Sequence, residues 1–209
     1  EGVLSRKFIA IITDKNVVNL HLSRLVTALS EAGIETKTLS INPGEGSKSW
    51  KTLQATVEWM LANKIERNDM VVALGGGVVG DLVGFAAAIL RRGIRFIQCP
   101  TSLLAQVDSS VGGKTGINTQ HGKNLVGSFY QTSKVISDIS TLITIKERDF
   151  LAGYGEVVKY GLLGDYDFYC WLEANFAKIK ERDTETLIKA VAHSCLLYTS
   201  PSPRDAIPS

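Results

Sequence analysis

This sequence has few cysteines, few histidines and a small net charge, and each of these observations excludes a class of protein. The three cysteines lie far apart without a C-x-x-C pair, which argues against a disulfide scaffold and is typical of reduced thiols in the cytosol. The three histidines show neither H-x-x-x-H nor H-E-x-x-H spacing, so they indicate no complete metal site. A net charge of +2 is too small to predict a nucleic acid or an acidic membrane surface as partner.

Long apolar runs and prolines are also few. No run reaches the length of a membrane span, and no signal peptide is visible. The 209 residues, 44% of them hydrophobic, suffice for one sizeable core or two small ones. Three of the five prolines fall in the last nine residues, where the apolar periodicity has ended. We therefore expect residues 197–209 to be a non-native tail on a truncated chain.

Short apolar runs alternate with helical periodicity over the first two thirds of the chain. Runs of strand type cover residues 8–13, 36–41, 71–74, 96–100 and 134–138, and helical spacing occupies the segments between the first four. This alternation predicts an α/β fold with a parallel sheet and crossover helices. From residue 146 the pattern is helical throughout. We predict an α/β domain over 1–145 and the first part of a helical domain over 146–196.

A glycine-rich stretch over residues 71–84 joins one of these strands to a helix. Gly75, Gly77 and Gly80 match the G-x-G-x-x-G spacing of dinucleotide sites, in which a pyrophosphate lies at the helix N-terminus. The alternative is a tight turn whose glycines serve only close packing. The acid expected about twenty residues further on, for the ribose, is absent.

Several polar residues follow the carboxyl ends of predicted strands, where ligands of parallel sheets bind. Asp14 is a candidate for the ribose hydroxyls, or else a helix N-cap. Glu45 and Lys48 follow the second strand, and a solvated loop is their alternative interpretation. Pro100 ends the fourth strand at the same predicted edge. This convergence is stronger evidence for a ligand site than any one motif.

Residues 101–127 mix glycines with small polar residues, which we interpret as loops. Lys114 and Lys123 are isolated among small residues there, an arrangement suited to phosphate or carboxylate recognition. Lys114 does not belong to a P-loop, because position 108 is aspartate rather than glycine. Further on, Glu156 and Lys159 share one helix face at a spacing that a surface ion pair also explains.

Five separated motifs in order resemble the 3-dehydroquinate synthase family: 75–81, 100–101, 107–115, 122–124 and 153–161. The resemblance implies an NAD-binding α/β domain and a helical domain that supplies a divalent metal, zinc or cobalt. It also implies a cytoplasmic homodimer with the active site in the interdomain cleft. The implied reaction converts 3-deoxy-D-arabino-heptulosonate 7-phosphate, a sugar phosphate, to 3-dehydroquinate and phosphate in the shikimate pathway, with NAD used catalytically.

The same resemblance assigns roles to individual residues. The implied NAD positions are Asp14, Asn16, Glu45, Lys48, Gly76, Gly77, Val78, Asp81, Thr101, Ser102, Leu104, Lys123 and Thr144. The implied catalytic residues are Asp108, Lys114, Asn124 and Lys159, and the implied substrate-binding residues are Arg92, Lys114, Lys123, Asn124 and Lys159. Arg92 would reach the phosphate bound by the neighbouring subunit. Glu156 matches the carboxylate ligand of the metal.

Three positions depart from the family pattern: Ser102 replaces a threonine, Asp149 a glutamate and Lys146 a proline. The two histidines that complete the family's metal site would lie past the end of this chain, so we expect the 209-residue form to be inactive. Three alternatives remain open. They are another sugar phosphate cyclase, a metal-dependent dehydrogenase of the glycerol dehydrogenase type, and a non-catalytic nucleotide-binding module.

Overall fold

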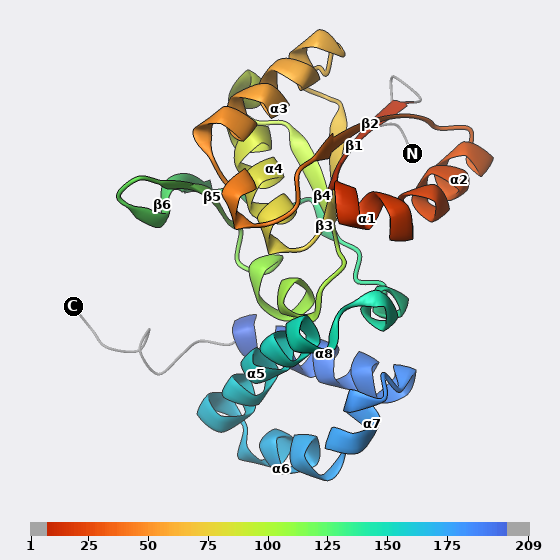
Figure 1. Ribbon diagram of the computed structural model, residues 1–209, viewed down its shortest axis with the longest axis vertical. Helices are drawn as coiled ribbons and strands as arrows, with labels where there is room; N and C mark the ends of the chain where they lie inside the picture. The colour runs from red at the N-terminus through yellow and green to blue at the C-terminus, as the bar shows by residue number, and fades with distance from the viewer. Residues whose placement is uncertain (1–7, 200–209) are drawn as a thin grey trace.

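The computed structural model describes residues 8–199, in which a parallel sheet lies above a bundle of helices (Figure 1). The sheet has the strand order β2-β1-β3-β4-β7, and every neighbouring pair is parallel, as predicted. Its strands are β1 (Phe8–Asp14), β2 (Glu35–Ile41), β3 (Met70–Gly75), β4 (Arg95–Pro100) and β7 (Lys134–Val135). Strands β1 and β3 are nearly continuous apolar runs because helices cover both faces of the sheet.

Two groups of helices bury the two faces of the sheet. On one face lie α1 (Lys15–Val17), the π-helical turn η1 (Val18–Leu22) and α2 (Ser23–Glu31), whose leucines pack on β1 and β3. On the other face lie α3 (Trp50–Ala62) and α4 (Gly77–Ile89). Helix α4 is apolar almost all round and buries eight of its residues, so it forms the centre of this half of the molecule.

The register of the sheet brings four strand ends to one edge. Asp14 at the end of β1 is opposite Ile41 of β2, and Gly75 at the end of β3 is opposite Pro100 of β4. Thr13 pairs with the residue before Gly75. The convergence of strand ends predicted from the sequence is therefore present at the level of the backbone.

The glycine-rich segment after β4 was predicted as loops, and this prediction is wrong in part. Residues 114–129 form an antiparallel hairpin of β5 (Lys114–Thr119) and β6 (Gly122–Phe129), which projects from the body of the molecule (Figure 1). Gly116 and Gly127 are cross-strand partners, and a Cβ on Gly116 would lie 2.7 Å from the carbonyl oxygen of Val126. The glycines allow the two backbones to approach closely. Because glycine has a low strand propensity, the sequence of this segment does not indicate a strand.

The last strand is also shorter than predicted. Residues 134–138 were expected to be extended, but only Lys134 and Val135 pair with β4. Asp138 instead begins the 3₁₀ segment η5 (Ile139–Thr144), and its carboxylate accepts a hydrogen bond of 2.9 Å from the Ser140 amide. This local cap competes with further pairing and directs the chain towards the helical bundle.

The bundle contains α5 (Glu147–Gly164), α6 (Tyr166–Ala174), α7 (Phe176–Lys180) and α8 (Thr184–Thr199). Its core also includes Leu103 and Val107, which come from the segment that follows β4 and the π-helical turn η4 (Ala105–Ser109). The bundle thus packs directly on residues next to the carboxyl edge of the sheet. The domain boundary at residue 145 stays a prediction. Among residues 8–199, no helix combines the length and hydropathy that crossing a bilayer requires.

His193 on α8 is partly exposed, with 34% of its side chain accessible, and it also connects α8 to the start of α6. Its Nε2 lies 2.8 Å from Oδ2 of Asp165, and its ring packs on Phe168 with centroids 4.2 Å apart. Asp165 also caps α6 by accepting a hydrogen bond of 2.9 Å from the Phe168 amide. The pKa of Asp165 is lowered mainly by this amide bond and, to a smaller extent, by the bond to His193.

We expect the Asp165→Ala variant to lose thermal stability at pH 7 and to lose less at pH 3. A carboxyl whose pKa is lowered by folding stabilises the protein above its ordinary pKa of 3.8, and this contribution disappears as the pH falls through the lowered value. Thermal melts followed by circular dichroism at the two pH values measure the difference. Asp167→Ala, on the same helical turn, is the control and should cost less at pH 7. Equal losses of thermal stability for Asp165→Ala and Asp167→Ala would contradict the stabilising role given to Asp165.

Candidate active site

Asp14 ends β1 and caps the helical segment that follows. Its Oδ1 accepts hydrogen bonds of 2.8 Å from the Asn16 amide and 3.1 Å from the Val17 amide. The N-cap alternative is thus correct. Its second carboxylate oxygen has no hydrogen bond from any described residue, so binding of a ribose by Asp14 stays compatible with the cap.

The glycine turn after β3 leaves the N-terminus of α4 without a side-chain cap. Gly76 is the N-cap residue, and no side chain bonds to the first amides of the helix. A Cβ on Gly77 would lie 2.9 Å from Oγ of Ser109, which is buried and has no hydrogen-bond partner among the described residues. Uncapped amides at a positive helix end, beside a glycine that keeps the approach open, suit a pyrophosphate.

Lys48 is nearly inaccessible, with 4% of its side chain exposed, so the solvated-loop interpretation is wrong for this residue. Its Nζ lies 2.5 Å from Oδ2 of Asp81 on α4 and 3.8 Å from Oε1 of Glu45, and it also donates to Oδ1 of Asn124 on β6. Burial raises the pKa of Asp81, and the bond from Lys48 opposes this rise. One buried ammonium therefore connects the loop after β2, helix α4 and the hairpin.

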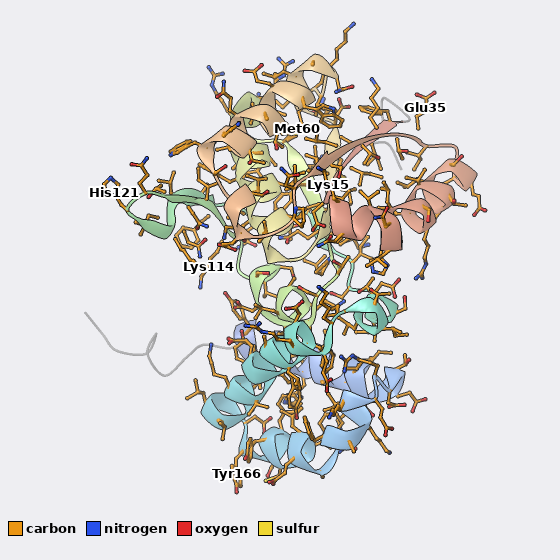
Figure 2. All side chains as sticks on the ribbon, viewed as in Figure 1. Lys15, Glu35, Met60, Lys114, His121 and Tyr166 are labelled. Atoms are coloured by element: carbon orange, nitrogen blue, oxygen red, sulfur yellow. The ribbon has the colours of Figure 1, made fainter. Side chains whose placement is uncertain are left out.

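A cavity of about 450 Å³ lies between α4, the hairpin and the bundle. The polar side chains that line it include Asp81, Asp108, Ser109, Lys114 and Asn124. Lys114 lies at the base of the hairpin, on the side that faces the bundle (Figure 2). Ser109, one of the lining residues, lies against the glycine turn, since a Cβ on Gly77 would be 2.9 Å from its Oγ. The cavity thus combines two carboxylates, one exposed lysine and a serine that lies against the glycine turn.

Tyr160 on α5 connects the bundle to this cavity and was missed in the sequence. Its hydroxyl donates a hydrogen bond of 3.2 Å to Oδ1 of Asp108. Burial, followed by the nearby charges of Asp108 and Glu156, raises the pKa of Tyr160, which keeps the phenol protonated as a donor. The only signal in the sequence is its place four residues after Glu156, on the same helix face.

Family models match both parts of the chain. A model described as 3-dehydroquinate synthase N-terminal matches residues 38–152, and one described as 3-dehydroquinate synthase C-terminal matches residues 153–205. The 3-dehydroquinate synthase of Ruegeria sp. (strain TM1040) is 55% identical over 203 residues, which cover 97% of this chain and 54% of that protein. The chain belongs to the 3-dehydroquinate synthase family. It spans about half the length of the curated relatives it matches.

Solved structures extend the likeness to related cyclases. A 2-epi-5-epi-valiolone synthase from Streptomyces hygroscopicus, with NAD⁺ and Zn²⁺ bound, is 28% identical with a TM-score of 0.88, over 91% of this chain and 54% of that one. A 2-deoxy-scyllo-inosose synthase complexed with carbaglucose-6-phosphate, NAD⁺ and Co²⁺ is 31% identical with a TM-score of 0.69, over 75% of this chain and 42% of that one. Both support the α/β fold class.

Arg92 and Lys123, both assigned through the 3-dehydroquinate synthase resemblance, lie away from the cavity. Arg92 follows the C-terminus of α4, the opposite end from the cavity, and a 13-residue helix is about 20 Å long. Arg91 and Arg92 both have positive φ, which is uncommon for residues other than glycine and turns the chain sharply here. Lys123 is exposed on β6 and does not line the cavity.

Thr144 is also separate from the cavity. Its Oγ1 lies 2.9 Å from Nε2 of His21, and it donates to the Thr141 carbonyl at 2.8 Å. A smaller pocket of about 170 Å³ beside it is lined by residues that include Thr101 and Thr141. Thr101 thus lies between the glycine turn, whose Gly75 carbonyl accepts its amide at 3.0 Å, and this second pocket.

The described residues do not form a complete metal site. Glu156 is the expected carboxylate ligand, but its charge is paired with Lys159. No group of three histidine, cysteine, aspartate or glutamate side chains within residues 8–199 is arranged to hold a metal ion. Zinc in catalytic sites takes three protein ligands, so this part of the chain does not fit the metal by itself.

Proposed function

We propose that this chain is the NAD-binding and substrate-binding part of a 3-dehydroquinate synthase. The reaction would release phosphate from 3-deoxy-D-arabino-heptulosonate 7-phosphate and form 3-dehydroquinate. The observation that carries the proposal is the cavity that Asp108, Lys114 and Asn124 line together, beside the uncapped N-terminus of α4 that Gly77 places against Ser109. A site of this kind can hold a nucleotide and an anionic sugar side by side.

The proposed NAD site follows the carboxyl edge of the sheet. The amides after Gly76 would bind the pyrophosphate, and Asp14 would use its free carboxylate oxygen for a ribose. Lys48, which we place near the adenosine part, would bind the nucleotide together with its partner Asp81. NAD supplies a reversible hydride acceptor when bound. The remaining NAD positions stay proposals: Asn16, Glu45, Gly77, Val78, Thr101, Ser102, Leu104, Lys123 and Thr144.

The proposed substrate site is the cavity itself. Lys114 would provide a cation for the phosphate or carboxylate, and Asn124 would donate or accept a hydrogen bond at a ring hydroxyl. Asp108, oriented by the Tyr160 hydroxyl, would hold or move a proton at the substrate. Lys159, on the helix face of Glu156, would contact the same substrate after release from its ion pair.

The metal, the oligomer and the cellular location belong to the same proposal. Glu156 would contribute one ligand to a zinc or cobalt ion, with the other ligands supplied from outside residues 8–199. Arg92, exposed at the far end of α4, would serve the phosphate site of a second subunit in a homodimer. The partner molecule is a small sugar phosphate, and the proposed location is the cytoplasm.

The first test is calorimetric titration of the chain with NAD. We expect binding to the wild type and a loss of at least about tenfold in affinity for Gly77→Val, because the added side chain would strike Ser109 and cover the helix amides. Gly46→Ala is the control, since no atom lies within 4 Å of the Cβ it would add. Equal affinity for all three proteins would contradict the proposed nucleotide site.

The second test addresses the reaction. A chimera would join residues 1–195 of this chain to the remaining length of the Ruegeria relative, and phosphate release and NADH would be followed together. Phosphate release without net NADH is the expected result, and net NADH would favour a dehydrogenase of the glycerol dehydrogenase type. The 209-residue chain, with added NAD and zinc, should release no phosphate. Calorimetric NAD binding with no turnover from either protein would favour a non-catalytic nucleotide-binding module.

A further inference from the structure

Asn118, near the end of β5, uses its backbone amide and both polar atoms of its side chain to connect β5 with two other segments. Its backbone amide donates to the Lys48 carbonyl at 2.8 Å, and its Nδ2 donates to Oε1 of Glu45 at 2.9 Å. Its Oδ1 accepts the Asn124 amide at 2.9 Å. A single side chain thus bonds the loop after β2 and the second strand of the hairpin.

Asn124 is held in an unusual backbone conformation. Its φ is +56°, in the left-handed region that costs non-glycine residues energy unless their surroundings impose it. Asn118 accepts its amide, and Lys48 donates to its side chain. These two bonds aim the Asn124 side chain at Lys48 and the cavity. An isolated two-stranded hairpin is marginally stable, so this anchoring has to come from the body of the molecule.

We propose that Asn118 is a positioning residue that fixes Glu45 beside the buried Lys48 and fixes Asn124 at the wall of the nucleotide and substrate cavity. The inference rests on the proposed function, because it gives Glu45 and Asn124 their ligands. Neither Asn118 nor Glu45 lines the main cavity, and both line a neighbouring hollow with Lys48. Its role requires one donor and one acceptor at the same time, which an amide provides and a carboxylate does not.

The decisive variant is Asn118→Asp, which keeps the acceptor for Asn124 and loses the donor for Glu45. Two carboxylates would then lie within hydrogen-bond distance and repel until they share a proton. The charged groups that face this pair are Lys48, 3.8 Å from Glu45, then Asp81 beyond it, and Lys51, which lines the hollow that contains Glu45 and Asn118. We expect NAD affinity about tenfold below wild type near pH 7.5, with the ratio recovering near pH 5.

Exchanging the amide and the carboxylate between positions 118 and 45 should remove the pH dependence. In the double variant Asn118→Asp with Glu45→Gln, the new amide donates to the new carboxylate, so the variant-to-wild-type affinity ratio should no longer depend on pH. Gln120→Ala, an exposed change in the same hairpin, is the control and should leave NAD affinity unchanged. An affinity loss in Asn118→Asp that is the same at both pH values would overturn the proposal, because general damage to the hairpin does not reverse on protonation.

Amide hydrogen exchange separates this inference from the proposed function. In Asn118→Leu the Asn124 amide loses its acceptor and should exchange at least about tenfold faster, whereas Asn118→Asp should keep it protected. This result needs no ligand. If the wild type fails to bind NAD, the nucleotide proposal fails, and the exchange data still decide whether Asn118 positions Asn124. Protection of Asn124 in Asn118→Leu would overturn the positioning role.

Discussion

Replacing Lys48 with methionine is expected to lower the free energy of unfolding by about 3–5 kcal/mol at pH 7, the usual cost of removing one partner from a buried ion pair. The variant leaves Asp81, whose side chain is 18% exposed, without its cation, and it leaves the Asn124 side chain without its donor. NAD binding should be lost as well, because the hairpin and α4 are no longer held together. Urea unfolding and calorimetry measure the two effects.

The pH dependence of this loss identifies its cause. Burial already raises the pKa of Asp81 above its ordinary 3.8, and the pKa should rise further without Lys48. A raised folded-state pKa means that ionisation costs stability as the pH rises above 3.8, so the deficit of Lys48→Met should be smallest at pH 3–4. Adding Asp81→Asn should recover much of it at pH 7. Lys51→Met, an exposed neighbour, should change stability by no more than about 0.5 kcal/mol.

Two glycines on helix α5 should respond to alanine with opposite signs. A Cβ on Gly153 would lie 2.6 Å from the backbone nitrogen of Leu104 and 2.9 Å from Cβ of Leu103. Backbone atoms cannot move aside easily, so Gly153→Ala should destabilise the protein by about 1–3 kcal/mol. Nothing lies within 4 Å of the Cβ position of Gly155, and alanine there should stabilise the helix by about 0.5–1 kcal/mol.

The same pair tests how the bundle contacts the nucleotide edge. Leu103 and Leu104 follow the end of β4 next to Thr101 and Ser102, so a shift caused by Gly153→Ala should also weaken NAD binding. Gly155→Ala should leave NAD binding unchanged. Chemical denaturation and titration on the same preparations measure both quantities. Destabilisation by both substitutions would show that the close contact at Gly153 is not the cause.

The parallel sheet was predictable because buried parallel strands leave a strong local signal. The runs before Asp14 and Gly75 are apolar on both faces, the run before Pro100 is largely apolar, and turn or cap residues end each of them. The hairpin was not predictable in the same way. The two strands approach so closely at Gly116 and Gly127 that only glycine fits there, whereas glycines in a sequence are more typical of loops.

The candidate site also contains residues that the sequence revealed and residues that it did not. Asp81, Asp108 and Lys114 were assigned through family motifs, and they line one cavity. Tyr160 and Asn118 were missed because their roles depend on partners 52 and 73 positions away in sequence, Asp108 and Glu45. Hydrogen bonds over such separations leave no periodic signal in a single sequence.

The order of the parallel strands and their helices along the chain, the glycine turn and the family can all be inferred from the sequence, because they depend on residues close together in the chain. Only the tertiary structure decided that Lys48 is buried among three segments, that the hairpin forms one wall of the cavity, and that the bundle reaches Asp108 through Tyr160. Burial and charge pairing are properties of the whole packed arrangement, so local propensities do not contain them.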